Sequence, residues 1–233
     1  AVEREKVPRW RDGLSAVHVT AKSYPRVTST EENGVALYKM TDSGMVRNDV
    51  RTFAELGLKE REHLQQVLMK DISVLEEGLL VIAEEYGDFD GANRRIDLLA
   101  LDQDGSLVVI ELKRTTDGGH MELQALRYAA FVSAMTFDDV LRTYTAHREL
   151  HGEPGGDPRA ELLAHLGYVN EEDNPDIANS VRIILVSADF GHEITTTVLW
   201  LNDTFDMRIR CVQLLPHQIA GETFVEIRQL IPL

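Results

Sequence analysis

A nearly continuous apolar run that ends in two charged residues limits the folds open to this chain of 233 residues. Residues 106–113 read SLVVIELK. A short run of this kind predicts a strand that is buried on both faces in the middle of a sheet. Charged groups on such a strand are costly unless they are paired or bind a metal ion. Glu111 and Lys113 lie two positions apart, so they project from the same face of the strand.

A second strand-like run lies directly before the first. Residues 94–102 read RRIDLLALD, and the turn that follows contains Asp104-Gly105. An Asp-Gly pair between two apolar runs is a strong signal for a tight hairpin. Pairing around this turn brings Asp97 level with Glu111. We therefore expect two carboxylates and one ammonium group at one edge of the sheet.

The rest of the chain predicts an α/β fold with a mixed central sheet flanked by helices and an N-terminal extension. Apolar periodicity predicts helices over 59–72 and 120–136 and in 194–203. The segment 138–180 reads as an acidic, mostly helical insertion with breaks at 153–158 and 171–176, and it contains ten Asp/Glu and three Lys/Arg. The further predicted strands are 35–40, 79–86, 181–187, 207–215 and 224–230.

Two carboxylates beside a lysine suit metal-assisted cleavage of a phosphodiester bond. Mg²⁺ prefers hard oxygen ligands, and Asp97, Glu111 and the backbone carbonyl of Leu112 could supply them. A metal lowers the pKa of a bound water and stabilises charge on the phosphate. Lys113 can orient that water or stabilise the charged transition state.

These residues resemble a known superfamily. The spacing Asp97-x13-Glu111-x-Lys113 is similar to the PD-(D/E)xK motif of restriction-endonuclease-like nucleases. More narrowly, RRIDLLALDQDGSLVVIELKR resembles the catalytic hairpin of NucS/EndoMS-type DNA endonucleases, and the resemblance extends over about 58–136. It implies that Asp97, Glu111 and the Leu112 carbonyl hold Mg²⁺ or Mn²⁺ and that Lys113 acts in catalysis.

The resemblance also implies helper residues on the two neighbouring helices. A glutamate from the preceding helix often joins such sites; Glu62 is the first candidate and Glu60 the alternative. Gln124 and Tyr128 fit a QxxxY element on the following helix. The alternative for these two residues is a role only in packing that helix. The alternative for Lys113 is a buried salt bridge in an inactive member of the fold.

The charge of the chain is unusual for a DNA-binding protein. Its formal net charge is −15, whereas most dedicated DNA binders are basic. Phosphate contacts must therefore be local, and Arg94, Arg95 and Arg114 beside the predicted site are candidates, with solvated surface positions as the alternative. The basic stretch of residues 1–12, which contains Trp10, is another candidate, unless it packs on the core or mediates a dimer.

The predicted organisation is a single nuclease domain with an extension. Residues 1–52 form an N-terminal extension for DNA binding or dimerisation, so a homodimer is one expectation, and 53–233 form the nuclease domain. The sequence has no apolar run long enough to span a membrane and no apolar signal at its start, and its single cysteine, Cys211, lies in an apolar run. We expect a cytoplasmic protein with a buried, inert thiol.

Two classes of function follow from this sequence. The first is a metal-dependent deoxyribonuclease, expected to be an endonuclease in repair, restriction or defence, and RNA as the substrate stays open. The second is an inactive descendant of the nuclease fold that serves as a nucleic-acid or protein interaction module. The complete set of site residues favours the first class, and the net charge of −15 favours the second.

Overall fold

The fold is built around one mixed sheet. The computed structural model describes residues 24, 37–58, 60–87, 95–113, 121–152, 155–170 and 172–232, and only the backbone of 60–62. Six strands follow one another across the sheet in chain order: β3 (Leu80–Tyr86), β4 (Ile96–Leu101), β5 (Ser106–Lys113), β6 (Ala178–Ser187), β7 (Ile209–Ile219) and β8 (Glu222–Ile231). β6 runs parallel to both β5 and β7, and the other neighbouring pairs are antiparallel. The predicted α/β class with a mixed sheet is confirmed.

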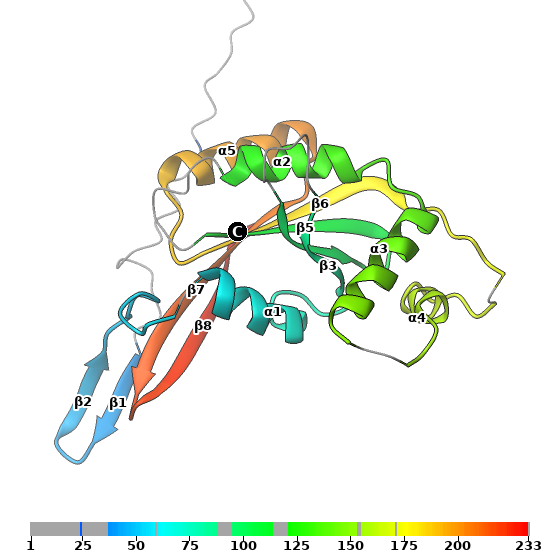
Figure 1. Cartoon of the computed structure of the whole chain (residues 1–233). Helices are drawn as coiled ribbons and strands as arrows, with labels where there is room; N and C mark the ends of the chain where they lie inside the picture. The colour runs from blue at the N-terminus through cyan, green and yellow to red at the C-terminus, as the bar shows by residue number, and fades with distance from the viewer. Residues whose placement is uncertain are drawn as a thin grey trace, which may run out of the picture.

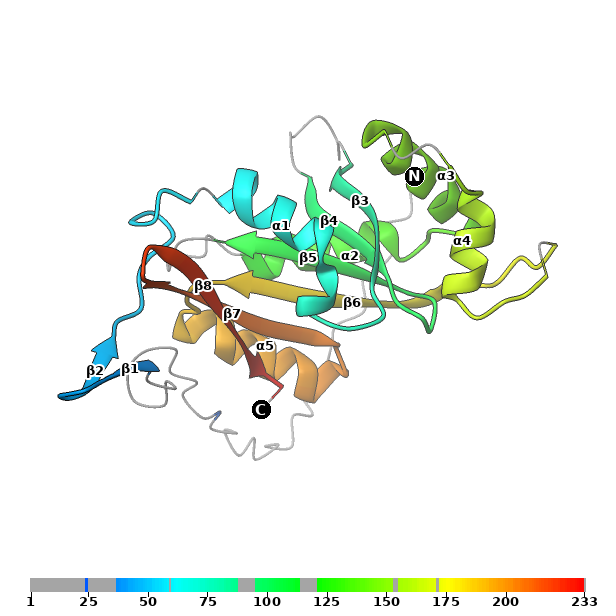
Figure 2. The same cartoon turned by 90° about the horizontal axis from the view of Figure 1, so that it is seen from below.

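Helices cover both faces of this sheet (Figures 1 and 2). α2 (Met121–Val132) and α5 (His192–Phe205) lie on one face. The π-helix η1 (Glu60–Gln65), α1 (Gln66–Lys70) and the 3₁₀ turn η2 (Ile72–Val74) lie on the other. α3 (Phe137–Leu150) packs at the β3 edge, next to α4 (Pro158–His165). The sheet therefore separates two apolar cores, and β5 is buried along its whole length except at Lys113.

The predicted hairpin of β4 and β5 is confirmed. Leu98 pairs with Ile110 and Leu101 pairs with Leu107. Asp102 closes the turn, because its Oδ1 accepts hydrogen bonds from the backbone N–H groups of Asp104 and Ser106 at 3.0 and 2.7 Å. Gly105 has a φ of +79°, a left-handed conformation that favours glycine. The DQDG sequence thus fixes the register of the two strands.

The first helix differs from its prediction. The apolar spacing predicts one amphipathic helix over 59–72 with Val67 on its apolar face, but the chain forms a π turn, a short α turn and a 3₁₀ turn in succession. Val67 is 62% exposed, whereas Gln65 is only 3% exposed. A π-helix forms hydrogen bonds between residues i and i+5, so it buries other positions than an α-helix does. The apolar spacing of an α-helix therefore does not predict that Val67 is exposed and Gln65 buried.

The acidic insertion contains two helices separated by a break. α3 and α4 confirm two helices in 138–180, but 166–170 and 172–177 form turns and irregular chain, and β6 begins at Ala178. The described residues 155–157 and 172–176 are not helical, in agreement with the predicted breaks at 153–158 and 171–176. Asn170 and Pro175 interrupt this region, and Pro cannot donate a helical hydrogen bond.

A two-stranded ribbon forms the described part of the N-terminal extension. β1 (Leu37–Thr41) confirms the predicted strand, and β2 (Gly44–Asn48) pairs with it but was not predicted. The ribbon joins the distal half of the β7–β8 hairpin through a bridge between Val50 and His217, and both project from the body (Figure 1). We call residues 37–51 and 214–227 together the arm.

Two other expectations concern the core and the membrane. Cys211 is buried as predicted, and burial raises the pKa of its thiol to about 12. The described helices include none that is both long and apolar enough to cross a bilayer.

Candidate active site

The predicted site residues meet where β4 begins and β5 ends. The register between the strands stops at Leu98 and Ile110, so Asp97 and Glu111 follow directly beyond the last pair. Both side chains are buried, with 3% and 1% of their surface exposed, whereas Lys113 is partly exposed. The hairpin therefore holds two buried carboxylates just beyond its last residue pair, and a partly exposed lysine follows Glu111 by two residues.

Asp97 is held by the neighbouring strand. Its Oδ2 accepts a hydrogen bond from the backbone N–H of Leu112 at 2.8 Å. The backbone N–H of Leu112 lies just beyond the last β4–β5 residue pair, and the carboxylate of Asp97 accepts its hydrogen bond. This contact fixes Asp97 beside the peptide between Glu111 and Leu112. The role of the Leu112 carbonyl as a metal ligand stays a prediction.

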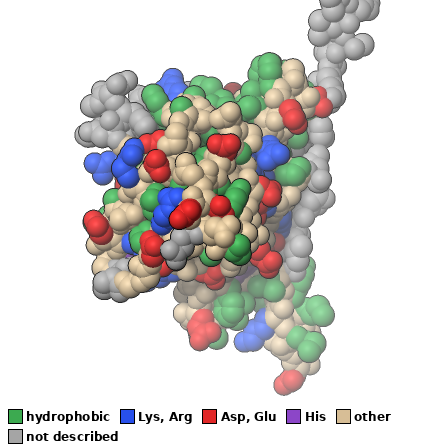
Figure 3. Space-filling model, turned by 90° about the vertical axis from the view of Figure 1, so that its right-hand side faces the viewer, with side chains coloured by type: hydrophobic (Ala, Val, Ile, Leu, Met, Phe, Trp, Pro, Cys, Tyr) green, Lys and Arg blue, Asp and Glu red, His purple; other side chains and the backbone are tan. Residues whose placement is uncertain are grey.

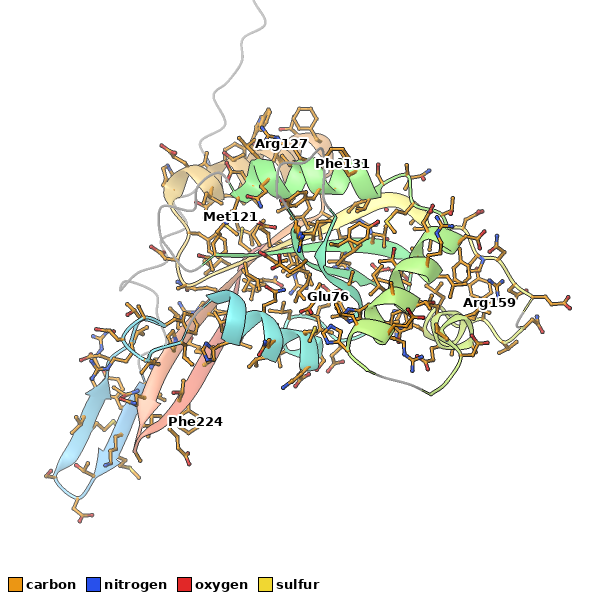
Figure 4. The ribbon with its side chains drawn as sticks, viewed as in Figure 1. Glu76, Met121, Arg127, Phe131, Arg159 and Phe224 are labelled. Carbon is orange, nitrogen blue, oxygen red and sulfur yellow. The ribbon has the colours of Figure 1, made fainter. Side chains whose placement is uncertain are left out.

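Glu111 is held from the other side by α2. Gln124 donates from Nε2 to Glu111 Oε1 at 2.7 Å and to the hydroxyl oxygen of Tyr128 at 3.0 Å. Lys113 Nζ lies 4.0 Å from the same Glu111 oxygen. Figure 4 labels Arg127 and Phe131, two side chains of α2 that point away from the sheet. The structure thus brings Gln124 into contact with the predicted metal ligand and links Tyr128 to that ligand through Gln124.

A further buried residue contacts the site and was not predicted. Gln65, the last residue of η1, donates from Nε2 to the backbone oxygen of Asp97 at 3.1 Å. The helix η1 contacts both β4 and β5. The sequence gives no clear signal for Gln65, because the spacing rules of an α-helix do not apply to the π turn in which it lies.

Several predicted residues cannot be placed with this group. Arg94 and Arg114 lie outside the described residues, and so do the side chains of Glu60 and Glu62, although their backbone belongs to η1. Arg95 is exposed and directly precedes β4. Their roles in binding metal or phosphate stay predictions.

The carboxylates described above are the type of ligand that a hard divalent cation prefers. Asp97 and Glu111 supply carboxylate oxygens, which Mg²⁺ and Mn²⁺ prefer. Burial makes two nearby carboxylates costly without compensating cations. Among the side chains that the structure describes, no three or more His, Cys, Asp or Glu are arranged to hold a metal ion. A glutamate of η1 that completed the site would have to be Glu60 or Glu62, whose side chains lie outside the described residues.

Comparison with known proteins agrees with this geometry. Residues 60–148 match the family model of the endonuclease NucS C-terminal domain, a segment that includes η1, the β4–β5 hairpin and α2. This match confirms the predicted resemblance to NucS-type endonucleases over the segment that carries the candidate site. No protein among those with curated descriptions matches the chain.

One solved structure is also similar. It is described as "Structure of EndoMS-dsDNA2 complex", is 20% identical, and aligns with a TM-score of 0.33. The alignment covers 70% of this chain and 44% of that chain, so this protein spans less than half the length of that relative.

Proposed function

We propose that this protein is a Mg²⁺- or Mn²⁺-dependent deoxyribonuclease that cuts DNA internally. The observation that carries this proposal is the pair of buried carboxylates, Asp97 and Glu111, that follow the last residue pair of the β4–β5 hairpin. The match of 60–148 to the NucS C-terminal domain supports the nuclease class.

In the proposed reaction, the contacts of each residue indicate its role. Asp97 and Glu111 would hold the metal, whose contribution is to activate a water and to stabilise negative charge on the scissile phosphate. The Leu112 N–H orients Asp97, and Gln124 orients Glu111 while leaving its charge in place. Lys113 is partly exposed, so its ammonium group can reach a phosphate and stabilise charge that develops there.

Isosteric variants test this assignment. Asp97→Asn and Glu111→Gln should cut labelled DNA at least about 10²-fold more slowly than the wild type and should bind Mn²⁺ more weakly in calorimetry. Asp104→Asn is the matched control, because it removes the same charge from an exposed position in the turn of the same hairpin. Single-stranded, double-stranded and branched DNA should each be tested with and without metal.

The results separate three cases. Loss of cleavage in both site variants, with activity kept in the control, supports the proposal. Full cleavage by a folded Asp97→Asn protein would contradict the assignment of that residue. If the wild type binds DNA but cuts none of the three substrates with either metal, the chain is an interaction module of the nuclease fold, the reading that its net charge of −15 favours.

A further inference from the structure

A groove lies on the α2 side of the sheet, between the second half of α2 and the connection from α5 to β7. It has a volume of about 400 Å³, and residues of α2, of the start of β6 and of that connection line it. Leu126, Val181 and Met207 supply apolar groups that are only partly buried, although each packs against the core. Figure 3 shows hydrophobic side chains at the top of the molecule, the side on which α2 and α5 lie in Figure 1.

The floor of this groove is the edge of an incompletely paired strand. β6 begins at Ala178, but its register with β7 begins only at Ile183. No described strand therefore pairs with residues 179–181 on the β7 side, and these residues line the groove. The edge of a strand presents backbone N–H and C=O groups to which an extended segment can add. The groove thus suits an extended stretch of polypeptide.

The first described residue of the chain lies beside this groove. Tyr24 donates a hydrogen bond from its hydroxyl to Asp203 Oδ2, at 3.3 Å, in the last turn of α5. Asp206, three residues further along the chain, lines the groove. Trp200 and Phe205 contact each other edge to face, with ring centroids 5.0 Å apart, and are 45% and 57% exposed. The chain that precedes Tyr24 therefore starts from the rim of an apolar surface.

The residues before Tyr24 have the pattern of a half-buried strand. Residues 13–23 lie outside the described part of the structure and read GLSAVHVTAKS. Val17, Val19 and Ala21 alternate with polar residues, so an extended segment would place all three on one face. At about 3.3 Å per residue this segment reaches roughly 36 Å, whereas the 14 residues of α5 span roughly 21 Å. The segment is therefore long enough to follow the groove away from Tyr24.

The charge at the end of α5 also suits this segment. The last turn of α5 contains no basic residue, and Asp203 and Asp206 are exposed there. The carbonyl groups at the C-terminus of a helix add to this negative potential and favour a nearby cation. Lys22 stands two residues before Tyr24, so the segment would bring a cation to this end of the helix.

We propose that residues 13–23 bind in the groove as an extended segment that Tyr24 anchors on α5. The apolar face of the segment covers the apolar lining of the groove, and its backbone pairs with the free edge of β6. Lys22 faces the carboxylates at the end of α5. These residues are thus part of the folded domain, and their docking does not depend on the proposed function.

Hydrogen exchange of the full chain tests this docking. Val17→Asp/Val19→Asp places charges on the proposed apolar face, and His18→Asp/Thr20→Asp is the matched control because it places as many carboxylates on the opposite face. The first variant should raise the exchange rate of the amides of 178–182 about tenfold, because exchange follows local opening. The control should exchange there like the wild type. Unchanged exchange in the β4–β5 hairpin verifies that both variants are folded.

A milder variant and a dilution series complete the test. Tyr24→Phe removes only the hydroxyl contact with Asp203 and should raise the same exchange by a smaller factor. The proposal is wrong if the two double variants exchange equally at 178–182, whether at the rate of the wild type or faster. If the protection of these amides in the wild type falls as the protein is diluted, a second copy of the chain occupies the groove, which contradicts docking within one chain. None of these measurements involves DNA or cleavage, so their failure leaves the proposed function intact.

Discussion

The contacts of Lys113 separate its proposed role from that of the carboxylates. Its Nζ lies 4.0 Å from Glu111 Oε1, a weak ion pair, and the side chain is partly exposed. Partly exposed ion pairs add little to stability. Lysine at this position is therefore better explained by an interaction with substrate than by support of the fold.

Replacement of Lys113 should slow chemistry without weakening metal binding. Lys113→Met keeps the apolar stem and removes the charge, so we expect a loss of roughly 10²-fold in kcat, as for other electrostatic stabilisers. Removal of a cation beside Glu111 should leave the affinity for Mn²⁺ unchanged or slightly higher. Single-turnover cleavage and calorimetry measure the two quantities. A loss of Mn²⁺ binding in a folded variant would assign Lys113 to the structure of the site.

Gln65 should matter for metal binding more than for stability. Its Nε2 fixes the backbone of Asp97, and residues that orient metal ligands contribute about 10- to 100-fold to affinity. Gln65→Met should therefore weaken Mn²⁺ binding about tenfold at a nearly unchanged melting temperature. The matched control is Gln213→Met, which removes another buried glutamine whose Nε2 donates to a backbone carbonyl, that of Ala188 at 3.0 Å.

The two variants distinguish positioning from general packing. If both weaken Mn²⁺ binding equally, or if Gln65→Met lowers only the melting temperature, Gln65 is a structural residue. Should Gln65→Met fail to fold, Gln65→Asn retains the amide on a shorter side chain and tests the same contact.

At the scale of the elements, a network of ion pairs links the strands at the end of the sheet opposite the candidate site. Glu76, from the loop before β3, accepts hydrogen bonds from Arg182 on β6, at 2.7 Å, and from Arg210 on β7. Arg182 also donates to Asp102 in the β4–β5 turn at 3.0 Å. Burial alone would raise the pKa of Glu76, but hydrogen bonds and charges from the two arginines lower it below its ordinary value of 4.5. Figure 4 labels Glu76 beside the sheet.

This network should make stability depend on pH in the acidic range. A carboxyl whose pKa is lower in the folded state stabilises the fold above its unfolded value and loses that contribution as the pH falls through the folded value. We expect Glu76→Gln to destabilise the protein by about 1–3 kcal/mol at pH 7, less than for a fully buried pair because Glu76 is partly exposed. Denaturant unfolding should show this difference shrinking as the pH falls below 4.5, the ordinary value of this carboxyl. If the difference in the free energy of unfolding stays constant down to acidic pH, the charge of Glu76 does not stabilise the fold.

The elements also show what the sequence could predict. The β4–β5 hairpin was predictable because turn chemistry, apolar runs and the Asp–Glu–Lys spacing lie within a short stretch of chain. Most other strands followed from apolar and β-branched runs, and α2 followed from its apolar periodicity. The π turn of η1, the burial of Gln65 and the partners of Glu76 depend on contacts between residues far apart in the chain. Strand β2 of the arm was not predicted, because an exposed strand lacks the alternation of apolar and polar residues that indicates a half-buried strand.

At the scale of the whole molecule, we expect the basic residues among residues 1–12 to supply charge for DNA binding. Arg4, Lys6, Arg9 and Arg11 lie within twelve residues beside Trp10, outside the described part of the structure. Deletion of residues 1–12 should weaken DNA binding and lower the salt slope by about 0.9 for every phosphate that these cations neutralise, with Mn²⁺ affinity unchanged. A titration over several salt concentrations measures both effects. An unchanged slope and affinity would exclude residues 1–12 from DNA binding.

The connectivity of β5 also has a consequence for the order of folding. Its pairing with β4 closes through a four-residue turn, whereas its pairing with β6 must wait for a crossover that runs from Lys113 to Ala178. Loop closure costs more entropy over the longer segment, and local hairpins form in microseconds. The refolding chain can therefore bring Asp97 and Glu111 together before the parallel half of the sheet is assembled. The carboxylate pair would then form one of the earliest local structures of the chain, and a divalent cation that binds it would speed folding as well as stabilise the product.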